Sequence, residues 1–287
     1  MVLNIVILAA GKGTRMHSDK PKVLHSLAGK SLLQHVVDSA HTLNPAQIIV
    51  VYGHGGEMVP QSLQESKVKS VLQEPQLGTG HAVQQSLPFL DDSSVTLVLY
   101  GDVPLIQQGT LEKILTVQNT LSLLTQNLED PKGYGRIVRD TEGRVRSIIE
   151  EKDATSEQRK IREINTGILA APTSLLRKWL LKLRNENTQG EYYLTDIVAM
   201  AVAEGLKVNT VQVENAWEVA GINSKTQLAA LERLWQGELA GRLLLQGVTL
   251  ADPARVDIRG ELTCERDVEI DVGCIFEGRV HLAKGVK

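Results

Sequence analysis

The chain has 287 residues, 42% of them hydrophobic, which is enough to bury one large core or two ordinary ones and excludes disordered and fibrous classes. Its 31 basic residues nearly balance 34 acidic residues, so charge gives no reason to expect a nucleic-acid or anionic-membrane partner. No apolar run approaches the roughly 20 residues of a bilayer span, and two cysteines make no disulfide framework. The N-terminal run lacks a basic region and is not expected to be a signal peptide, so we expect a cytoplasmic enzyme.

The first 225 residues alternate short apolar runs with helix-length segments. The predicted strands are Asn4–Ala10, Ile48–Tyr52, Val95–Tyr100, Ser122–Thr125, Val145–Glu150, Ile168–Ala171 and Val208–Val213. Apolar residues at helical spacing predict helices over Lys30–Leu43 and Thr195–Ala203. This alternation predicts the α/β class, with a doubly wound, mostly parallel sheet whose ligand lies outside the carboxyl ends of the strands.

The remaining residues follow two further patterns. Asn223–Gln246 reads as one helix, with Leu234 on its apolar stripe and Gln236 off that stripe. After Gly247, apolar residues recur every six positions, which is typical of hexapeptide β-helices. The two columns are Leu250, Val256, Leu262, Val268, Cys274, Val280 and Val286, and Ile258, Cys264, Ile270, Phe276 and Leu282.

The six-residue columns lead to two expectations. Both cysteines lie in them, so we expect core-filling thiols and no metal site there. The repeat reaches the last residue without a cap, so we expect the front part of a longer protein, with a catalytic domain over 1–225, a linker helix over 226–246 and the start of a β-helix over 247–287.

The sharpest motif follows the first predicted strand. Leu8 to Met16 reads LAAGKGTRM, and Lys20-Pro21-Lys22 comes shortly after. Glycines let backbone N–H groups approach a phosphate, and Arg15 and Lys22 add two cations. The spacing fits neither a P-loop nor the dinucleotide fingerprint, whose third glycine is replaced by Met16. The combination predicts a polyanion site, whereas a bare Gly-x-Gly would indicate an ordinary turn.

These residues resemble the sugar-nucleotide pyrophosphorylases, whose signature L-A-A-G-x-G-T-R-x-x-x-x-x-P-K is matched at every fixed position by Leu8 to Lys22. The resemblance implies a Rossmann-like nucleotidyltransferase that joins a nucleoside triphosphate to a sugar 1-phosphate. It implies that Arg15 and Lys22 are catalytic because they neutralise the departing pyrophosphate. The residues that it places around the triphosphate are Leu8, Ala9, Ala10, Gly11 and Lys22.

A second cluster, Gln73 to Ala82, reads QEPQLGTGHA. On sequence alone it is a helix entry with Thr79 as its cap, or a binding loop. The family pattern places Gln73, Gly78 and Thr79 on the uracil. We expect His81 to be structural, because this chemistry needs no strong protein base.

A third cluster, Tyr100-Gly101-Asp102-Val103-Pro104, follows the most hydrophobic predicted strand. Asp102 could simply begin a turn before proline, but a carboxylate at that strand end also suits Mg²⁺. The resemblance implies that Tyr100, Gly101 and Asp102 contact substrate, that Asp102 is catalytic, and that Asp102 and Asn223 hold the Mg²⁺ cofactor. Asn223 also reads as a helix N-cap.

The sugar end of the site is expected from three further motifs. The resemblance places Gly135 in a turn against the hexose, and it assigns Asn165 to the sugar or its acetamido group. One glutamate of the pair Glu150-Glu151 is expected to bind sugar hydroxyls, and the family spacing from Asn165 favours Glu150. Asp196 reads as an acid in the first turn of a helix.

Loop motifs at 53–56, 189–193, 220–223 and 252–255 narrow the resemblance to bifunctional bacterial members of the family. These transfer UMP from UTP to N-acetylglucosamine 1-phosphate for peptidoglycan and lipopolysaccharide synthesis, and acetylate glucosamine 1-phosphate with acetyl-CoA through a trimeric β-helix. The resemblance implies a homotrimeric longer protein, and we expect this chain to keep uridylyl transfer, to lack acetyl transfer and to associate weakly. The alternatives are a related enzyme with another base or sugar, and a non-catalytic sugar-nucleotide-binding homologue.

Overall fold

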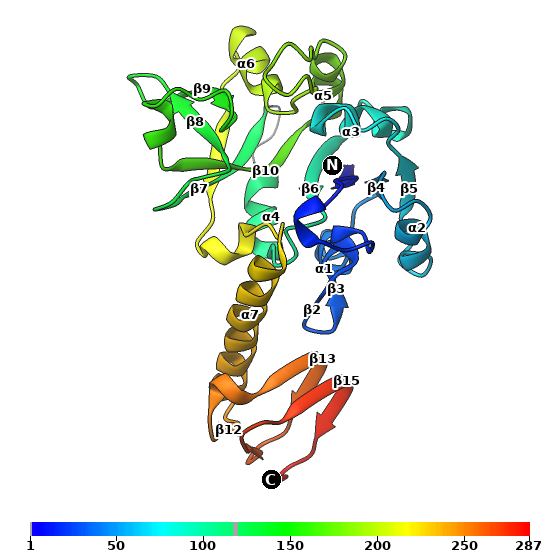
Figure 1. The fold of residues 1–287 in the computed structure, drawn as a ribbon, viewed down its shortest axis with the longest axis vertical. Coiled ribbons are helices and arrows are strands. Elements are labelled where there is room, and N and C mark those ends of the chain that lie inside the picture. Colours follow the sequence, from blue (N-terminus) through cyan, green and yellow to red (C-terminus); the bar gives the residue numbers. More distant parts are fainter. Residues whose placement is uncertain (1, 117–119) are drawn as a thin grey trace. The chain divides into compact units, whose positions relative to one another are not determined.

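The computed structural model describes residues 2–116 and 120–287, which form two compact units (Figure 1). The large unit comprises residues 1–12 and 35–221, and the small unit comprises residues 13–34 and 222–287. Residues 13–34, which we call the signature segment, therefore belong with the C-terminal part of the chain. The domain boundaries predicted after residues 225 and 246 stay predictions.

The large unit is built on a mixed sheet in the order β11-β7-β10-β6-β1-β4-β5, with β8 and β9 attached through β10. β1 pairs in parallel with β4 and β6, β4 with β5, and β7 with β11, whereas β10 runs antiparallel to β6 and β7. The strands are β1 Leu3–Ala9, β4 Gln47–Tyr52, β5 Lys69–Leu72, β6 Val95–Tyr100, β7 Ser122–Asn127, β8 Gly135–Arg139, β9 Val145–Ile149, β10 Glu163–Pro172 and β11 Asn209–Gln212. The predicted α/β class with a Rossmann-like, parallel-dominated sheet is confirmed.

Helices α3, α5 and α6 cover one face of this sheet and share one apolar core with it, in which Trp179 is fully buried. The α-helices before residue 222 are α1 Leu32–His41, α2 Met58–Ser62, α3 Thr79–Ser86, α4 Gln108–Leu115, α5 Thr173–Leu180 and α6 Asp196–Ala203. α1 begins later than predicted because Lys30 and Ser31 pair with a short strand.

The small unit contains the hairpin of β2 (Ser26–Leu27) and β3 (Lys30–Ser31), the long helix α7 (Lys225–Leu245) and four C-terminal strands. β12 (Thr249–Leu250) pairs in parallel with β14 (Glu269–Ile270), and β13 (Asp257–Cys264) with β15 (Ile275–Leu282). Asp257 lies opposite Ile275, an offset of 18 residues or three six-residue periods. Cys264 and Cys274 are free and pack against the apolar cluster of this region, as predicted.

Two details of α7 differ from the prediction. Ser224 caps the helix by accepting a hydrogen bond from the Gln227 N–H, so the N-cap is Ser224 and not Asn223. The predicted apolar stripe is wrong at Leu234, which is 40% exposed, while Gln236 is only 2% exposed. The contacts of α7 with the C-terminal strands thus include the side chain of Gln236, which the periodicity had placed off the apolar stripe.

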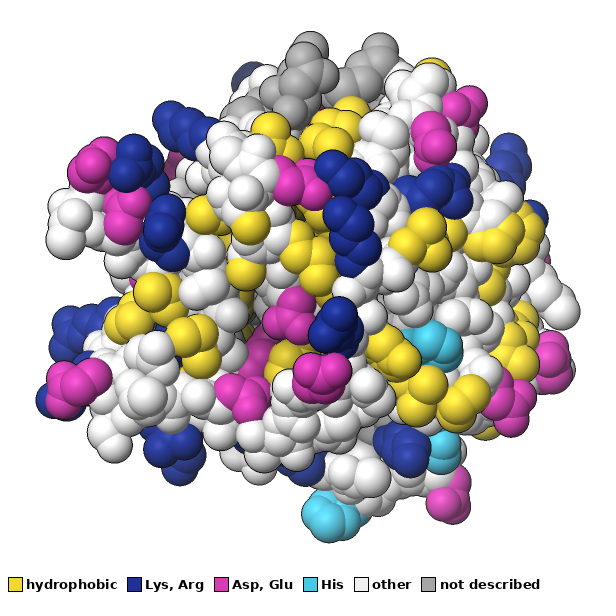
Figure 2. All heavy atoms as spheres, turned by 90° about the horizontal axis from the view of Figure 1, so that it is seen from above, with side chains coloured by type: hydrophobic (Ala, Val, Ile, Leu, Met, Phe, Trp, Pro, Cys, Tyr) yellow, Lys and Arg dark blue, Asp and Glu magenta, His cyan; other side chains and the backbone are white. Residues whose placement is uncertain are grey.

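None of the described helices is long and apolar enough to cross a bilayer. Figure 2 shows basic and acidic side chains interspersed over the face that it presents, in keeping with the near balance of charge in the sequence.

We expect Gly260→Ala to lower the free energy of unfolding by more than about 1 kcal/mol. Gly260 has φ +144°, and a Cβ there would lie 2.2 Å from the Gly278 carbonyl oxygen of the paired strand. Gly237→Ala in α7 is the control, because no atom lies within 4 Å of its Cβ position and helix propensity favours alanine by about 0.8 kcal/mol. Urea denaturation checks both, and equal midpoints for the two variants would contradict the close approach.

Candidate active site

The carboxyl ends of β1, β4 and β6 meet at one edge of the sheet. Leu8 lies opposite both Val51 and Tyr100 in the two parallel ladders, and the Gly101 N–H donates to the Leu8 carbonyl over 2.9 Å. The Gln73 N–H donates to the Tyr52 carbonyl over 2.7 Å. Parallel strands leave a sheet on the same side, and ligands of open α/β sheets bind there. Leu8, Ala9 and Ala10 are buried at this edge, whereas Gly11 is exposed.

The side chain of Gln73 is buried and held in one orientation. Its Nε2 donates to the Gly78 carbonyl over 3.0 Å and lies 3.1 Å from Nδ1 of His81. Since a carbonyl can only accept, the nitrogen of the amide is at this position, and the His81 tautomer with its proton on Nε2 presents Nδ1 as the acceptor. Burial lowers the pKa of the His81 imidazole, which favours the neutral form that can accept. His81 therefore positions Gln73.

Thr79 does not cap α3, because the cap position is Gly78 and Thr79 is the first helical residue. Its Oγ1 accepts from the Leu194 N–H over 3.1 Å, and it also hydrogen-bonds the Tyr100 hydroxyl. Burial raises the pKa of Tyr100, and the charges of Glu150 and Asp102 raise it further. Thr79 and Tyr100 are therefore in direct contact, and the Glu150 and Asp102 carboxylates are near enough for their charges to act on the Tyr100 hydroxyl.

Glu150 lies beside Gly135, which is the first residue of β8 and not part of a turn as predicted, because it pairs with Asn165 of β10. The Thr195 hydroxyl donates to Glu150 Oε1 over 3.1 Å, and a Cβ on Gly135 would lie 3.3 Å from Glu150 Oε2. Burial raises the pKa of the Glu150 carboxyl, with nearby Asp196 and Asp153 adding to the shift. Asn165 lies opposite Gly135 in the pairing of β10 with β8.

Glu150 and Glu151 have different partners, and this difference bears on which of the two could bind the sugar. Glu151 forms an ion pair with Arg136 at 2.7 Å, and the Arg136 side chain is 2% exposed. A buried guanidinium needs such a carboxylate, because its charge would otherwise be desolvated without compensation. Among the described residues, Glu150 has only the Thr195 hydroxyl as a hydrogen-bond partner, and it is the better candidate for a ligand contact.

Gly167 shapes the bulge after Asn165. Asn165 Oδ1 accepts from the Gly167 N–H over 3.1 Å, and Gly167 has φ +88°. A Cβ at this position would lie 2.5 Å from the Tyr100 ring. Only glycine fits this combination of backbone conformation and close approach. The bulge thus holds Asn165 and Tyr100 in place together.

In the small unit, Lys22 Nζ donates to Asn223 Oδ1 over 2.8 Å, so two predicted site residues that are 201 positions apart are in contact. Gly13 has φ +61°, and a Cβ there would lie 2.7 Å from the Lys22 Cβ. Met16 is fully buried, while the Arg15 side chain is exposed to solvent. The signature turn is therefore folded around Lys22, with Arg15 on its surface.

The structure brings the predicted site residues together in two groups. The first group, in the large unit, contains Gln73, Gly78, Thr79, Tyr100, Gly101, Asp102, Gly135, Glu150 and Asn165. The second group, in the small unit, contains Lys22 and Asn223, with Arg15 on the same turn. Asp102 and Asn223 belong to different units, and their pairing on a metal stays a prediction.

A carboxylate and an amide oxygen are donors that suit Mg²⁺. The described residues contain no group of three or more His, Cys, Asp or Glu that could hold a metal. Asn223 Oδ1 already accepts from Lys22, although an amide oxygen has a second lone pair. A metal at Asp102 or Asn223 would therefore depend on substrate phosphates for most of its ligands.

Sequence reasoning missed two residues of the large-unit group. The hydroxyl of Tyr134 hydrogen-bonds the Gly221 backbone, and burial followed by the Asp102 charge raises its pKa. Thr195 read only as a helix start, yet it is the hydroxyl donor to Glu150. Tyr134 lies in a Gly-Tyr-Gly motif, which could have marked it in the sequence as a site residue. Nothing in the sequence around Thr195 marks that residue.

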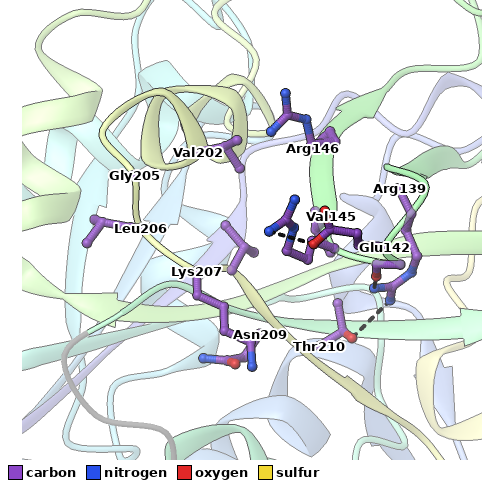
Figure 3. A pocket seen from close by; sticks show the side chains of 13 residues that line it. Arg139, Glu142, Val145, Arg146, Val202, Gly205, Leu206, Lys207, Asn209 and Thr210 are labelled. Atoms are coloured by element: carbon purple, nitrogen blue, oxygen red, sulfur yellow. Dashed lines mark hydrogen bonds and ion pairs between the residues drawn. The ribbon is translucent and has the colours of Figure 1, made fainter.

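A pocket of about 690 Å³ lies elsewhere, between the β8–β9 hairpin and the segment from α6 to β11 (Figure 3). None of the predicted site residues lines it. Figure 3 shows Arg139 reaching Thr210, and Arg139 also forms an ion pair with Glu163 at 2.6 Å. Arg144 is likewise paired with Asp140 and Glu142. The basic side chains that line this pocket are thus partly neutralised by acidic partners. We therefore place the active site at the carboxyl ends of the strands.

Comparison with known proteins gives a consistent family. Residues 5–153 match the family described as the MobA-like NTP transferase domain. The chain is 61% identical over 285 residues to the bifunctional protein GlmU of Methylobacillus flagellatus and 61% identical over 286 residues to that of Dechloromonas aromatica. The alignments cover 99% of this chain and 62% and 63% of those proteins, so the chain spans a little under two thirds of their length.

Solved structures support the fold alone, because their sequences are distant. A protein described as a glucose-1-phosphate thymidylyltransferase from Bacillus anthracis superposes with a TM-score of 0.67 at 19% identity, covering 81% of this chain and 95% of that one. A nucleotidyl transferase from Methanothermobacter thermautotroptrophicus superposes with a TM-score of 0.56 at 20% identity, covering 80% and 96%.

We expect Glu150→Gln to raise the thermal midpoint at neutral pH and to leave it nearly unchanged below about pH 4. The folded pKa of Glu150 is raised by burial, so the stability that this carboxyl contributes is fully present below its unfolded pKa and is lost as pH rises through its folded pKa. Glutamine mimics the protonated form and can still accept from Thr195.

Thermal melts of both proteins across this pH range check the expectation. Glu129→Gln, at an exposed position, is the control. A lower midpoint for Glu150→Gln at neutral pH would contradict it.

Proposed function

Since the chain belongs to the family of MobA-like NTP transferase domains, we propose that it transfers UMP from UTP to N-acetylglucosamine 1-phosphate, giving UDP-N-acetylglucosamine and pyrophosphate. The observation that carries the proposal is the parallel pairing of β1 with β6, which brings the start of the signature and Asp102 out of the sheet at one edge. High identity to the GlmU proteins supports the choice of nucleotide and sugar.

The orientation of Gln73 supports uracil as the base. Both hydrogens of its amide nitrogen have acceptors within the protein, Gly78 O and His81 Nδ1. Its Oε1 is then the atom that can meet a ligand, and an acceptor suits the N3–H of uracil. Cytosine carries no hydrogen at N3, so the same oxygen would face another acceptor and lose a hydrogen bond.

At the sugar end, Glu150 and Asn165 are the proposed ligands. Thr195 occupies only one oxygen of Glu150, which leaves acceptor capacity for sugar hydroxyls. Asn165 uses its Oδ1 on Gly167, so its amide nitrogen is the group that can donate to the sugar or its acetamido oxygen.

The proposed reaction is an in-line displacement at the α-phosphorus of UTP. An oxygen of the sugar phosphate forms the new bond, and the bond between the α-phosphorus and the bridging oxygen breaks, releasing pyrophosphate. The attacking phosphate is already ionised, so no general base is required, and catalysis comes from positioning and charge. Arg15 and Lys22 stabilise the charge that gathers on pyrophosphate, and Asn223 orients Lys22. Mg²⁺ bound through Asp102 and Asn223 would supply further neutralisation of the phosphates.

The C-terminal strands are proposed to be the first rungs of a left-handed β-helix. The offset of three six-residue periods between β13 and β15 supports this, as does the apolar cluster inside the turn. Acetyl transfer, homotrimer formation and a cytoplasmic location are proposals for the longer proteins that this chain resembles.

A matrix of nucleotides and sugar phosphates tests the function. Pyrophosphate release is measured for UTP, CTP, dTTP and ATP with N-acetylglucosamine 1-phosphate and glucose 1-phosphate, in the presence of Mg²⁺. UTP with N-acetylglucosamine 1-phosphate is expected to give the highest kcat/KM. A preference for dTTP with glucose 1-phosphate would indicate the related specificity instead, and no release with any pair would indicate a binding protein.

We expect Asp102→Ala to lower kcat by about 100-fold or more while the fold is kept, because a metal-binding carboxylate at the reacting phosphates is lost. Steady-state kinetics at saturating Mg²⁺ and far-UV circular dichroism measure the two properties. Glu129→Ala, at an exposed site of the same unit, is the control and should keep the wild-type rate. Full turnover of Asp102→Ala would remove this residue from the site.

We expect Gln73→Ala to narrow the UTP-to-CTP preference by about tenfold, the effect of losing one base-reading hydrogen bond. The measurement is kcat/KM for each nucleotide. His81→Ala should shift the preference in the same direction but less, because it only loosens Gln73. An unchanged preference in both variants would contradict base reading by Gln73.

A further inference from the structure

The signature segment is attached to α7 at a second point, far from Lys22. Glu232 lies two turns into α7, and its Oε2 accepts from the Ala28 N–H over 2.7 Å. Ala28 is at the tip of the hairpin formed by β2 and β3, which follows the Lys22 turn directly. The two residues are 204 positions apart, so only the tertiary fold connects them.

The hairpin tip has a conformation that needs external support. Ala28 has φ +48° and Gly29 has φ +82°, and the left-handed region is unfavourable for alanine by roughly 1 kcal/mol. A Cβ on Gly29 would lie 2.7 Å from the carbonyl carbon and oxygen of Arg259, so the tip lies directly on the backbone of β13. Ala28 is only 7% exposed, and its N–H would be unsatisfied without Glu232.

Glu232 is itself held by a hydrogen-bonded relay. Its Oε1 accepts from Gln236 Nε2 over 2.8 Å, and the same nitrogen donates to the Ile258 carbonyl over 2.8 Å. Gln236 Oε1 accepts from the Ile258 N–H over 2.7 Å. A continuous path of hydrogen bonds therefore runs from Ala28 through Glu232 and Gln236 to β13.

We propose that Glu232 is a positioning residue for uridylyl transfer: by holding the Ala28 N–H, it fixes the hairpin that ends the signature segment and so the placement of Lys22 and Arg15. The expected kinetic effect rests on the proposed function, whereas the contact between Ala28 and Glu232 does not. Lys22 and Glu232 act as two anchors of one segment, the first at the start of α7 through Asn223 and the second within the helix. With one anchor lost, the cations that meet pyrophosphate are less well placed.

Three variants of the full chain test this. Glu232→Ala removes the acceptor, Glu232→Gln keeps an acceptor oxygen for Ala28, and Glu238→Ala removes an exposed glutamate of the same helix. The readouts are kcat for UDP-N-acetylglucosamine formation, the KM for pyrophosphate in the reverse reaction, and amide hydrogen exchange over residues 13–31. A purely structural loss lowers the active fraction but leaves the pyrophosphate KM unchanged.

For Glu232→Ala we expect kcat to fall and the pyrophosphate KM to rise, each by about tenfold, the scale of one charge-assisted hydrogen bond. The KM for UDP-N-acetylglucosamine should change less than about twofold, and exchange over 13–31 should quicken while that of β4 does not. Glu232→Gln should recover part of both kinetic losses, because its oxygen can still accept from Ala28 although its amide nitrogen cannot accept from Gln236. Glu238→Ala should match the wild type.

An unchanged pyrophosphate KM in Glu232→Ala, unchanged exchange over residues 13–31, or an equal effect in Glu238→Ala would overturn the inference. A wild type without uridylyl transfer would overturn the proposed function instead, and the exchange measurement would still decide whether Glu232 holds the hairpin.

Discussion

The large unit depends on the two parallel ladders of β1. All seven residues of this strand are buried, and it is hydrogen-bonded to β4 on one side and β6 on the other. Since side chains alternate between faces with a period of two, a slip of one residue in either ladder would turn the core side chains to the opposite face. The register is therefore strongly specified, and it decides which residues leave the sheet at the carboxyl edge. Gln73 follows β5, the neighbour of β4, and Asp102 follows β6, so both reach that edge because of the same register.

Around this edge, three polar side chains of the candidate site are held by contacts within the protein and keep an atom that can meet a ligand. Gln73 is fixed through its nitrogen, Glu150 through one oxygen, and Asn165 through its Oδ1. Such preorganisation suits the proposed displacement at phosphorus, in which the protein transfers no proton and acts by position and charge. This preorganisation has a cost at Glu150. Burial raises the pKa of its carboxyl, whereas the proposed sugar contact uses the ionised form.

The small unit joins residues 13–34 to residues 222–287. The signature segment contacts α7 through Lys22 with Asn223 and through Ala28 with Glu232, and the β2–β3 hairpin tip lies on β13. A turn that is secured to a helix and a strand about 200 residues later is more rigid than a loop closed only on itself, since a surface loop alone has little packing to hold it. Under the proposed function, α7 supports the position of Lys22 and also packs against the C-terminal strands.

By itself the sequence determined the buried strands β1 and β6 to within a residue, the six-residue period of the C-terminal region, and the residues of the signature, because hydrophobic period and glycine turns are local properties. It left Glu150 and Glu151 in competition until the buried Arg136 engaged Glu151. It assigned the helix cap to Asn223 in place of Ser224, and it placed Gln236 outside a stripe that in fact buries it. Tertiary structure alone decided the Lys22–Asn223 and Ala28–Glu232 contacts, because a hydrogen bond between residues about 200 positions apart leaves no periodic trace in either segment.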